Sequence, residues 1–209
     1  MENKKIIALT FDDGPSDTTS LKVLDKLKKH GVPGSFFLIG QEITPEREYI
    51  VKEELTYGCD IENHSLTHSD MTKLDAETIR AEIEETTRRI MAITGKEPEF
   101  FRPPYILCND TMFENIPYIF VCGHASEDWI PETTAEQRAR KVIDGARDNM
   151  LVLLHDMEGN DNTVEALDII IPELKSRGFE FVTIRELFKR AGIDKSNAKK
   201  IIYTCTDDQ

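Results

Sequence analysis

A chain of 209 residues with 39% hydrophobic and 31% charged residues fits one soluble globular domain that buries a sizeable core. Its formal net charge of -13 argues against nucleic acid or an anionic membrane as a partner, because both are bound through basic surfaces. No segment approaches the ~20 consecutive apolar residues of a membrane span. The four cysteines are scattered without a C-x-x-C pair, so they indicate buried free thiols rather than a zinc knuckle or a redox motif.

The amino terminus lacks the pattern of a secretory signal. Residues 1–5 are polar, and the apolar run that follows them is too short for the hydrophobic part of a leader. The expected location is therefore cytoplasmic for the sequence as written, and extracellular if a leader has been removed from it.

Short apolar runs alternate with segments in which apolar residues recur at helical spacing. Leu21, Leu24 and Leu27 share one helical face, for example, and Asp75 is a predicted N-cap. In chain order, the pattern predicts a strand at 5–11, a helix at 20–31, a strand at 34–40, an extended stretch at 57–61, a helix at 75–95, strands at 100–101 and 118–123, a helix at 133–149, a strand at 150–155, a helix at 162–178 that Pro172 kinks or interrupts, and a strand at 179–184.

This alternation is typical of a mainly parallel sheet with crossover helices. About seven strand–helix units in a chain of this length fit a distorted or incomplete (β/α)7–8 barrel better than a doubly wound sheet. No repeat, low-complexity tract or interdomain linker interrupts the pattern, so residues 1–209 are predicted as one domain. The tail after about Ile193 is polar and is expected to be poorly ordered.

Unusual polar clusters follow the predicted strands. In a (β/α) barrel the chemistry lies where strands end and the loops to the helices begin, so clusters at several strand ends are expected to meet in space. The clusters are TFDDGP at 10–15, IENHSLTH at 61–68, FFRPPY at 100–105, ASEDW at 125–129 and LLHD at 153–156.

Two adjacent acids, Asp12 and Asp13, close the first strand. If the segment stays extended, their side chains point to opposite sides of the strand and are unlikely to share one role. Asp, Gly and Pro are also ordinary turn residues, so a solvated turn is the alternative for this cluster taken alone.

His64 and His68 are four residues apart in HSLTH. On a helical turn this spacing places two imidazoles on one face, close enough to share a cation. With a nearby acid they would form a His₂–carboxylate site that suits zinc or a similar divalent ion and leaves positions open for water and substrate. An exposed pair without a ligand is the alternative.

The motifs TFDDGP, HSLTH, RPPY, DW and LLHD occur in the order of the five motifs of the polysaccharide deacetylases, the NodB-homology family of carbohydrate esterases, also called carbohydrate esterase family 4. The chain resembles this family from about residue 6 to about residue 188. It is most similar to the acetylxylan-esterase members, through RPPYILCNDTMF and CGHASEDW.

The resemblance implies that one divalent ion, zinc or cobalt, is bound by Asp13, His64 and His68. It also implies that Asp12 is the catalytic base and that Arg102 pairs with Asp12, which keeps the base charged and oriented.

On the leaving-group side, the resemblance implies that His155 is the general acid and that Asp128 orients His155 or Arg102. The backbone N–H of Tyr105 would help to hold the oxyanion, Leu153 would line the pocket for the acetyl methyl group, and Trp129 would form part of the pocket wall.

Three residues depart from the family pattern. Ala125 stands where an acid usually lies three residues before the DW aspartate, which puts the tuning of His155 and Arg102 in doubt. Ile106 replaces a glycine that often follows RPPY, and it would narrow or reshape the cleft. Glu62 stands where glycine often precedes NH, and it would add a charge beside the metal loop.

The resemblance thus implies a metal-dependent hydrolase that removes acetyl groups from a polysaccharide, with O-acetyl groups of acetylxylan as the expected substrate. The alternatives are N-deacetylation of a chitooligosaccharide or a peptidoglycan glycan, and an inactive carbohydrate-binding relic of the fold. The expected partner is an acetylated polysaccharide or oligosaccharide, with no nucleic acid or membrane, and the expected state is a monomer.

Overall fold

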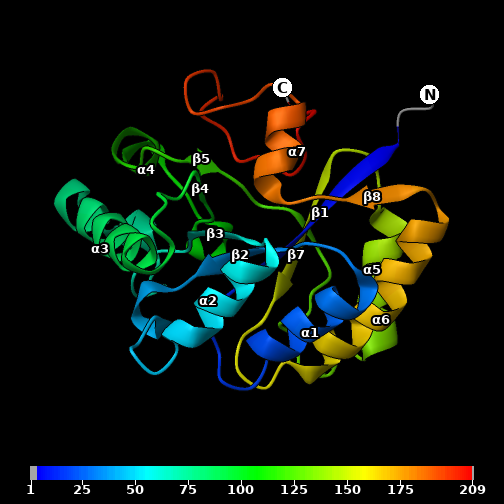
Figure 1. The fold of residues 1–209 in the computed structure, drawn as a ribbon. Coiled ribbons are helices and arrows are strands. Elements are labelled where there is room, and N and C mark those ends of the chain that lie inside the picture. The colour runs from blue at the N-terminus through cyan, green and yellow to red at the C-terminus, as the bar shows by residue number, and fades with distance from the viewer. Residues whose placement is uncertain (1–3, 209) are drawn as a thin grey trace.

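A computed structural model of the protein describes residues 4–208. Its strands form a parallel sheet in the order β5-β4-β3-β2-β1-β7-β6, and β8 pairs with the first residues of β1 (Figure 1). The strands are β1 (Lys5–Asp12), β2 (Ser35–Leu38), β3 (Asp60–Asn63), β4 (Phe100–Phe101), β5 (Ile119–Phe120), β6 (His124–Ala125), β7 (Met150–His155) and β8 (Phe179–Phe181). This is the distorted, incomplete α/β barrel that the sequence predicts.

The central strand β1 is buried along its length after Lys5, and its residues alternate between two apolar clusters. Ile7, Leu9 and Phe11 pack with the helices on the outer face of the sheet, whereas Ile6 and Ala8 pack on the other face. A strand buried on both faces reads as a continuous apolar run, which is why this element could be predicted from KIIALTF.

Helices cover the sheet on both faces. They are α1 (Ser20–His30), α2 (Glu48–Tyr57), α3 (Ala76–Thr94), α4 (Asp110–Asn115), α5 (Ala135–Gly145), α6 (Asp161–Ser176) and α7 (Ile184–Arg190). Helices α1, α5 and α6 pack side by side on the outer face, and α7 lies on the opposite face, near both ends of the chain (Figure 1).

Several predicted elements differ from the structure. The extended stretch expected at 57–61 begins with the end of α2, because Gly58 adopts φ 97 and stops that helix, and the strand is Asp60–Asn63. The sequence interpretation did not include α2, α4 or α7. Pro172 lies inside α6 without interrupting it.

The polar tail after Ile193 does not have the poor order that its composition suggested. Tyr203 is buried and packs on Phe188 with ring centroids 5.4 Å apart. The backbone N–H of Cys122 donates to the Tyr203 carbonyl at 2.8 Å. The backbone of Cys205 forms an isolated antiparallel β-bridge with that of Met150 in β7. The tail therefore fills the gap between β5 and β7 that an incomplete barrel leaves open.

The structure also bears on two expectations drawn from composition. All four cysteines are free thiols: Cys59 and Cys205 are buried, while Cys108 and Cys122 are only partly buried. Within residues 4–208, no helix combines the length and the apolar character needed to cross a membrane.

Tyr203→Ala should lower the free energy of unfolding by about 3 kcal/mol, because it removes a buried ring and leaves a cavity under the tail. Urea denaturation would measure the change. Tyr49→Ala is the matched control, since Tyr49 is half exposed and its truncation should change stability little. Equal effects of the two substitutions would contradict the buried packing of the tail.

Candidate active site

The polar clusters of the sequence meet at the carboxyl edge of the sheet. A pocket of about 430 Å³ opens there. Of the ten site residues that the sequence predicts, all but Arg102 and Asp128 line it; Arg102 and Asp128 lie buried behind it. The lining residues among the ten are Asp12, Asp13, His64, His68, Tyr105, Trp129, Leu153 and His155.

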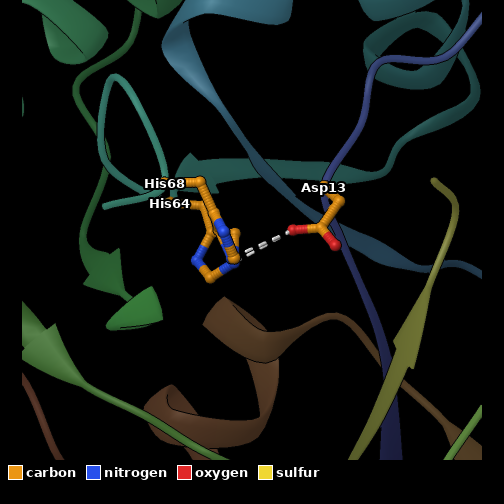
Figure 2. A group of neighbouring side chains, drawn as sticks. All are labelled: Asp13, His64 and His68. Atoms are coloured by element: carbon orange, nitrogen blue, oxygen red, sulfur yellow. Dashed lines mark ion pairs between the residues drawn. The ribbon is translucent and has the colours of Figure 1, made fainter. Parts of the chain in front are cut away.

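Asp13 and the two histidines form a compact group of possible metal ligands. Oδ1 of Asp13 lies 3.3 Å from Nε2 of His64 and 3.4 Å from Nε2 of His68, and the three ligand atoms lie within 4.8 Å of one another (Figure 2). Oδ1 of Asp13 is buried and accepts no hydrogen bond from the described residues. A buried carboxylate oxygen left in this way fits a cation bound between the three side chains.

The histidines present the correct nitrogen to such an ion. Nδ1 of His64 lies 2.6 Å from the Arg102 carbonyl, which can only accept, so Nδ1 donates and Nε2 keeps its lone pair for a metal. Burial and repulsion from His64 lower the pKa of His68, which favours the neutral imidazole that a metal needs.

The acid of this group is ionised. Burial alone would raise the pKa of Asp13, but the close approach and charge of His64 outweigh it and lower that pKa to about 2. For His64 the balance is similar: burial lowers its pKa, but the carboxylates of Asp12 and Asp13 raise it overall. A divalent ion that binds here therefore competes with a proton on His64.

The HSLTH segment is a loop, not the helical turn that the spacing suggested. Ser65 and His68 adopt φ 67 and φ 55, and the hydroxyl of Ser65 accepts a hydrogen bond from the backbone N–H of His68 at 3.0 Å. Glu82 of α3 holds the loop by accepting the N–H groups of Leu66 and Thr67, both at 2.9 Å. Sequence reasoning missed Glu82, although this acid lies on the apolar stripe of α3 with Ile79 and Ile83.

Asp12 and Asp13 do have separate partners, but not because the segment stays extended. Strand β1 ends at Asp12, and Asp13 adopts φ 74. One oxygen of Asp12 accepts a hydrogen bond from Nη1 of Arg102, and the other lies 3.8 Å from Nε2 of His64. Both carboxylates therefore face the same pocket, one held by the guanidinium and one by the imidazoles.

Arg102 is fully buried and makes the environment of Asp12 rigid. Its Nη2 donates to the Thr10 hydroxyl at 2.8 Å and to the carbonyl of Cys122, and its guanidinium stacks 4.2 Å from the ring centroid of Phe37. Both charges of the Asp12–Arg102 pair are out of water, so each depends on the other.

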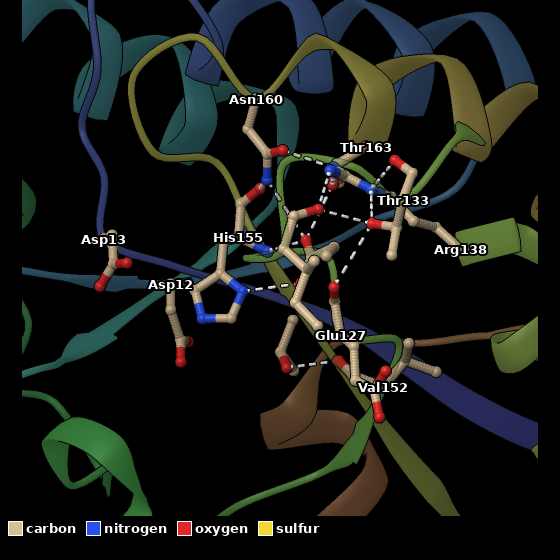
Figure 3. A network of polar contacts seen from close by, with 12 residues as sticks. Asp12, Asp13, Glu127, Thr133, Arg138, Val152, His155, Asn160 and Thr163 are labelled. Atoms are coloured by element: carbon tan, nitrogen blue, oxygen red, sulfur yellow. Dashed lines mark hydrogen bonds and ion pairs between the residues drawn. The ribbon is translucent and has the colours of Figure 1, made fainter.

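His155 lies across the pocket and is held from behind by Asp128. Nδ1 of His155 lies 2.8 Å from one oxygen of Asp128, and the His155 backbone N–H donates to the other oxygen at 2.8 Å. The edge of the His155 ring that Asp128 does not hold faces Asp12 and Asp13 (Figure 3). Burial opposes a charge on His155, but the hydrogen bond and charge of Asp128 outweigh it and raise the pKa of His155 to about 9.

Two exposed aromatic residues flank these groups. Tyr105 is 63% exposed, and its ring meets His68 edge to face with centroids 4.8 Å apart; Trp129 is 46% exposed and meets His155 at 5.6 Å. Leu153 is buried at the floor of the pocket. The geometry thus places apolar surface next to both imidazoles, as a sugar ring or an acetyl group requires.

Of the three departures, Ala125 and Ile106 line the pocket. Ile106 adopts φ 58 directly after Tyr105 at φ 57, a conformation that costs a β-branched residue about 1–2 kcal/mol. Ala125 does not deprive His155 of its partner, because Asp128 binds the ring by itself.

The expectation for Glu62 was wrong. Its carboxylate accepts from Nε of Arg185 at 2.7 Å and from the backbone N–H groups of Glu99 and Phe100, instead of adding a charge to the metal loop. Arg185 lies on α7, so the charge of Glu62 is paired with that helix. Burial raises the pKa of Glu62 to about 7, although Arg185 opposes the rise.

The chain is similar to known proteins over most of its length. Residues 1–117 match the family described as polysaccharide deacetylase. The chain is 46% identical over 200 residues to a bifunctional xylanase/deacetylase of Pseudobutyrivibrio xylanivorans, covering 96% of this chain and 33% of that protein. It is 38% identical to a peptidoglycan-N-acetylglucosamine deacetylase of Listeria monocytogenes, and the match covers 90% of this chain and 40% of that protein. The chain therefore spans only about a third to two fifths of these two relatives.

Two solved structures superpose over nearly the whole chain. The Xyl-CE4 domain of a multidomain xylanase from the hindgut metagenome of Trinervitermes trinervoides has a TM-score of 0.96 at 43% identity, covering 99% of this chain and 100% of that one. A family 4 acetyl xylan esterase from Clostridium thermocellum, in complex with a cobalt ion, has a TM-score of 0.92 at 45% identity. The match covers 96% of this chain and 98% of that one. This chain belongs to the polysaccharide deacetylase family.

Proposed function

We propose that the chain is a metal-dependent hydrolase that removes acetyl groups from a polysaccharide. One observation carries the proposal: a His₂–carboxylate group lies in one pocket between a carboxylate locked to a buried arginine and a histidine locked to a buried aspartate. These are the parts that hydrolysis of an acyl bond needs, namely a Lewis-acid site, a base and an acid.

The metal that we propose is a single zinc or cobalt ion held by Asp13, His64 and His68. Two imidazoles and one carboxylate suit a borderline divalent ion that keeps open positions, and a similar solved structure contains cobalt. When bound, such an ion supplies Lewis acidity that polarises a water molecule and the acetyl carbonyl.

Asp12 acts as the base in this proposal. It takes the proton of the attacking water while the new C–O bond forms, and Arg102 keeps the carboxylate ionised and aimed at the pocket. The backbone N–H of Tyr105 stabilises the oxyanion that develops on the acetyl group. The acetyl methyl packs against Leu153, and Trp129 closes the wall beside His155.

His155 acts as the acid. Its Nδ1–H is committed to Asp128, so Nε2 delivers the proton to the departing sugar oxygen as the bond to the acetyl carbon breaks, which yields acetate and a free hydroxyl group. A pKa of about 9 keeps His155 protonated at neutral pH. The ready supply of a proton here argues against an inactive carbohydrate-binding relic.

The substrate that we propose is O-acetylated xylan. The relatives named as a xylanase/deacetylase and an acetyl xylan esterase are 46% and 45% identical to this chain, and the Xyl-CE4 domain of a xylanase is 43% identical, whereas the peptidoglycan deacetylase of Listeria monocytogenes is 38% identical. An alkoxide also leaves more easily than an amine. N-deacetylation remains the second candidate because of one observation: Asp128 holds His155 in full despite Ala125, so the acid can also protonate an amine.

Substitution of the two adjacent acids should have different effects, one on turnover and the other on metal binding. Asp12→Asn should lower kcat by about 10²–10⁴-fold while zinc or cobalt still binds, because it removes the base. Asp13→Asn should weaken metal binding, because it removes a ligand. Calorimetric titration with zinc and acetate-release kinetics measure the two effects.

Asp17→Asn is the control for these variants, because Asp17 is an exposed acid of the same segment that pairs with Arg47. Chelation should abolish wild-type activity, and added zinc or cobalt should restore it. Loss of metal from Asp12→Asn with retention by Asp13→Asn would reverse the two roles, and full activity in metal-free protein would refute the metal.

Asp128→Asn should move the alkaline limb of the pH profile of kcat/KM to lower pH, by about one pH unit or more. An acid catalyst works while protonated, so activity is present below the pKa of His155 and is lost as the pH rises through it. Removing the Asp128 charge lowers that raised pKa toward the ordinary histidine value. An unchanged alkaline limb in pH-rate profiles of both proteins would show that another group titrates.

Acetylxylan should be hydrolysed with a higher kcat/KM than chitooligosaccharides at saturating metal. The measurement is acetate release from both substrates and from peptidoglycan. A preference for the N-acetylated glycan would overturn the choice of ester while leaving the deacetylase reaction intact, whereas no acetate from any of them would refute the reaction itself.

A further inference from the structure

Arg138 of α5 is one of the largest fully buried side chains of the protein, at 2% exposure, and lies behind the pocket. Among residues 4–208, its guanidinium donates only to neutral oxygens. The acceptors are Oδ1 of Asn160, Oγ1 of Thr163 at 2.9 Å, Oγ1 and the carbonyl of Thr133 at 2.9 and 3.1 Å, and the carbonyl of Ile130 at 3.2 Å. A buried charge without a direct counter-ion is costly, so its position calls for an explanation.

The explanation lies in the direction of the hydrogen bonds around Arg138 (Figure 3). A guanidinium can only donate, so the Thr163 hydroxyl must accept from it, and the single hydrogen of that hydroxyl is left for Asp128 Oδ2 at 2.8 Å. In the same way Oδ1 of Asn160 accepts from Arg138. The amide hydrogens of Asn160 must then point to the His155 carbonyl at 2.9 Å and to Asp128 at 3.4 Å.

Two side-chain donors held by Arg138, the Thr163 hydroxyl and the Asn160 amide, are therefore turned toward Asp128. The carboxylate of Asp128 is fully buried and accepts at Oδ2 from Thr163, from Asn160 and from the His155 backbone N–H. Oδ1 is left for Nδ1 of the His155 ring. Because Asp128 has no hydrogen to donate, Nδ1 must carry one, and Nε2 is the nitrogen that serves the pocket.

We propose that Arg138 is a positioning residue for His155: by fixing which way Thr163 and Asn160 donate, it fixes the orientation of Asp128 and the Nδ1–H form of the His155 ring. The Thr163 hydroxyl is the relay between the guanidinium and the carboxylate. The kinetic part of this inference rests on the proposed function, in which His155 donates a proton. The state of the His155 ring does not depend on that function.

Thr163→Val tests the relay, because valine keeps the shape of threonine and replaces the hydroxyl with a methyl group that can neither accept from Arg138 nor donate to Asp128. We expect kcat on acetylated xylan to fall about tenfold with KM within twofold, since the acid is misplaced while the substrate surface is unchanged. We also expect the Nδ1–H proton resonance of His155 to shift upfield or broaden in NMR spectra, because its acceptor is held less firmly.

Arg138→Met and Arg138→Lys test the guanidinium. Methionine should reproduce both effects of Thr163→Val, and the double variant Arg138→Met/Thr163→Val should be little worse than either single one. Lysine keeps the charge but cannot hold Thr163 and Asn160 in a planar fork, so it should restore less than half of the lost kcat. Arg140→Met is the matched control, because Arg140 lies on the same helix, is exposed and pairs only with Asp144.

Three results would overturn the inference. An unchanged His155 resonance and an unchanged kcat in Thr163→Val would show that the Thr163 hydroxyl is not a relay. This variant tests the inference even if Arg138→Met does not fold. Full recovery by Arg138→Lys would show that charge alone suffices. Equal effects of Arg140→Met would mean a general loss of stability. A wild-type protein that releases no acetate would refute the proposed function, whereas the Nδ1–H resonance would still report on Arg138.

Discussion

The buried ion pair between Arg102 and Asp12 is the interaction on which the rest of the site depends. Arg102 binds Asp12 and Thr10 of β1, reaches the Cys122 carbonyl beyond β5, and accepts Nδ1 of His64 on its own carbonyl. One residue thereby fixes the proposed base Asp12, the proposed metal ligand His64 and the spacing of three strand ends. Losing either charge would leave the other unpaired away from water, which is among the most destabilising changes a core can undergo.

His64 and His155, on opposite sides of the pocket, are oriented in the same way. Nδ1 of His64 is committed to the Arg102 carbonyl and Nδ1 of His155 to the Asp128 carboxylate, so each ring sends Nε2 into the pocket. The acceptors differ in charge, and that difference suits the two tasks. A neutral carbonyl stabilises the protonated form of a ring less than a carboxylate does, and the charge of Asp128 stabilises the imidazolium that the proposed acid requires.

Much of this site could be predicted because its residues sit in short motifs at strand ends. Asp12, Asp13, His64, His68 and His155 all lie in these motifs, and the order of the motifs identified the family. The geometry could not be predicted in the same way. Spacing suggested a helix for HSLTH, where backbone turns and Glu82 make a loop. Likewise, no motif marks Arg138, since a basic residue on an amphipathic helix ordinarily faces solvent.

The packing of the tail connects the far end of the chain to the chemistry. The backbone of Tyr203 pairs with Phe120 and Cys122 on either side of Val121, which follows β5, and the Cys122 carbonyl is one of the acceptors that hold Arg102. The tail is thus joined to Arg102, and through it to Asp12, by a single residue, Cys122. A boundary drawn at the last helix, after Arg190, would look harmless on a map of secondary structure, yet it would remove the backbone that holds Cys122 in place beside Arg102.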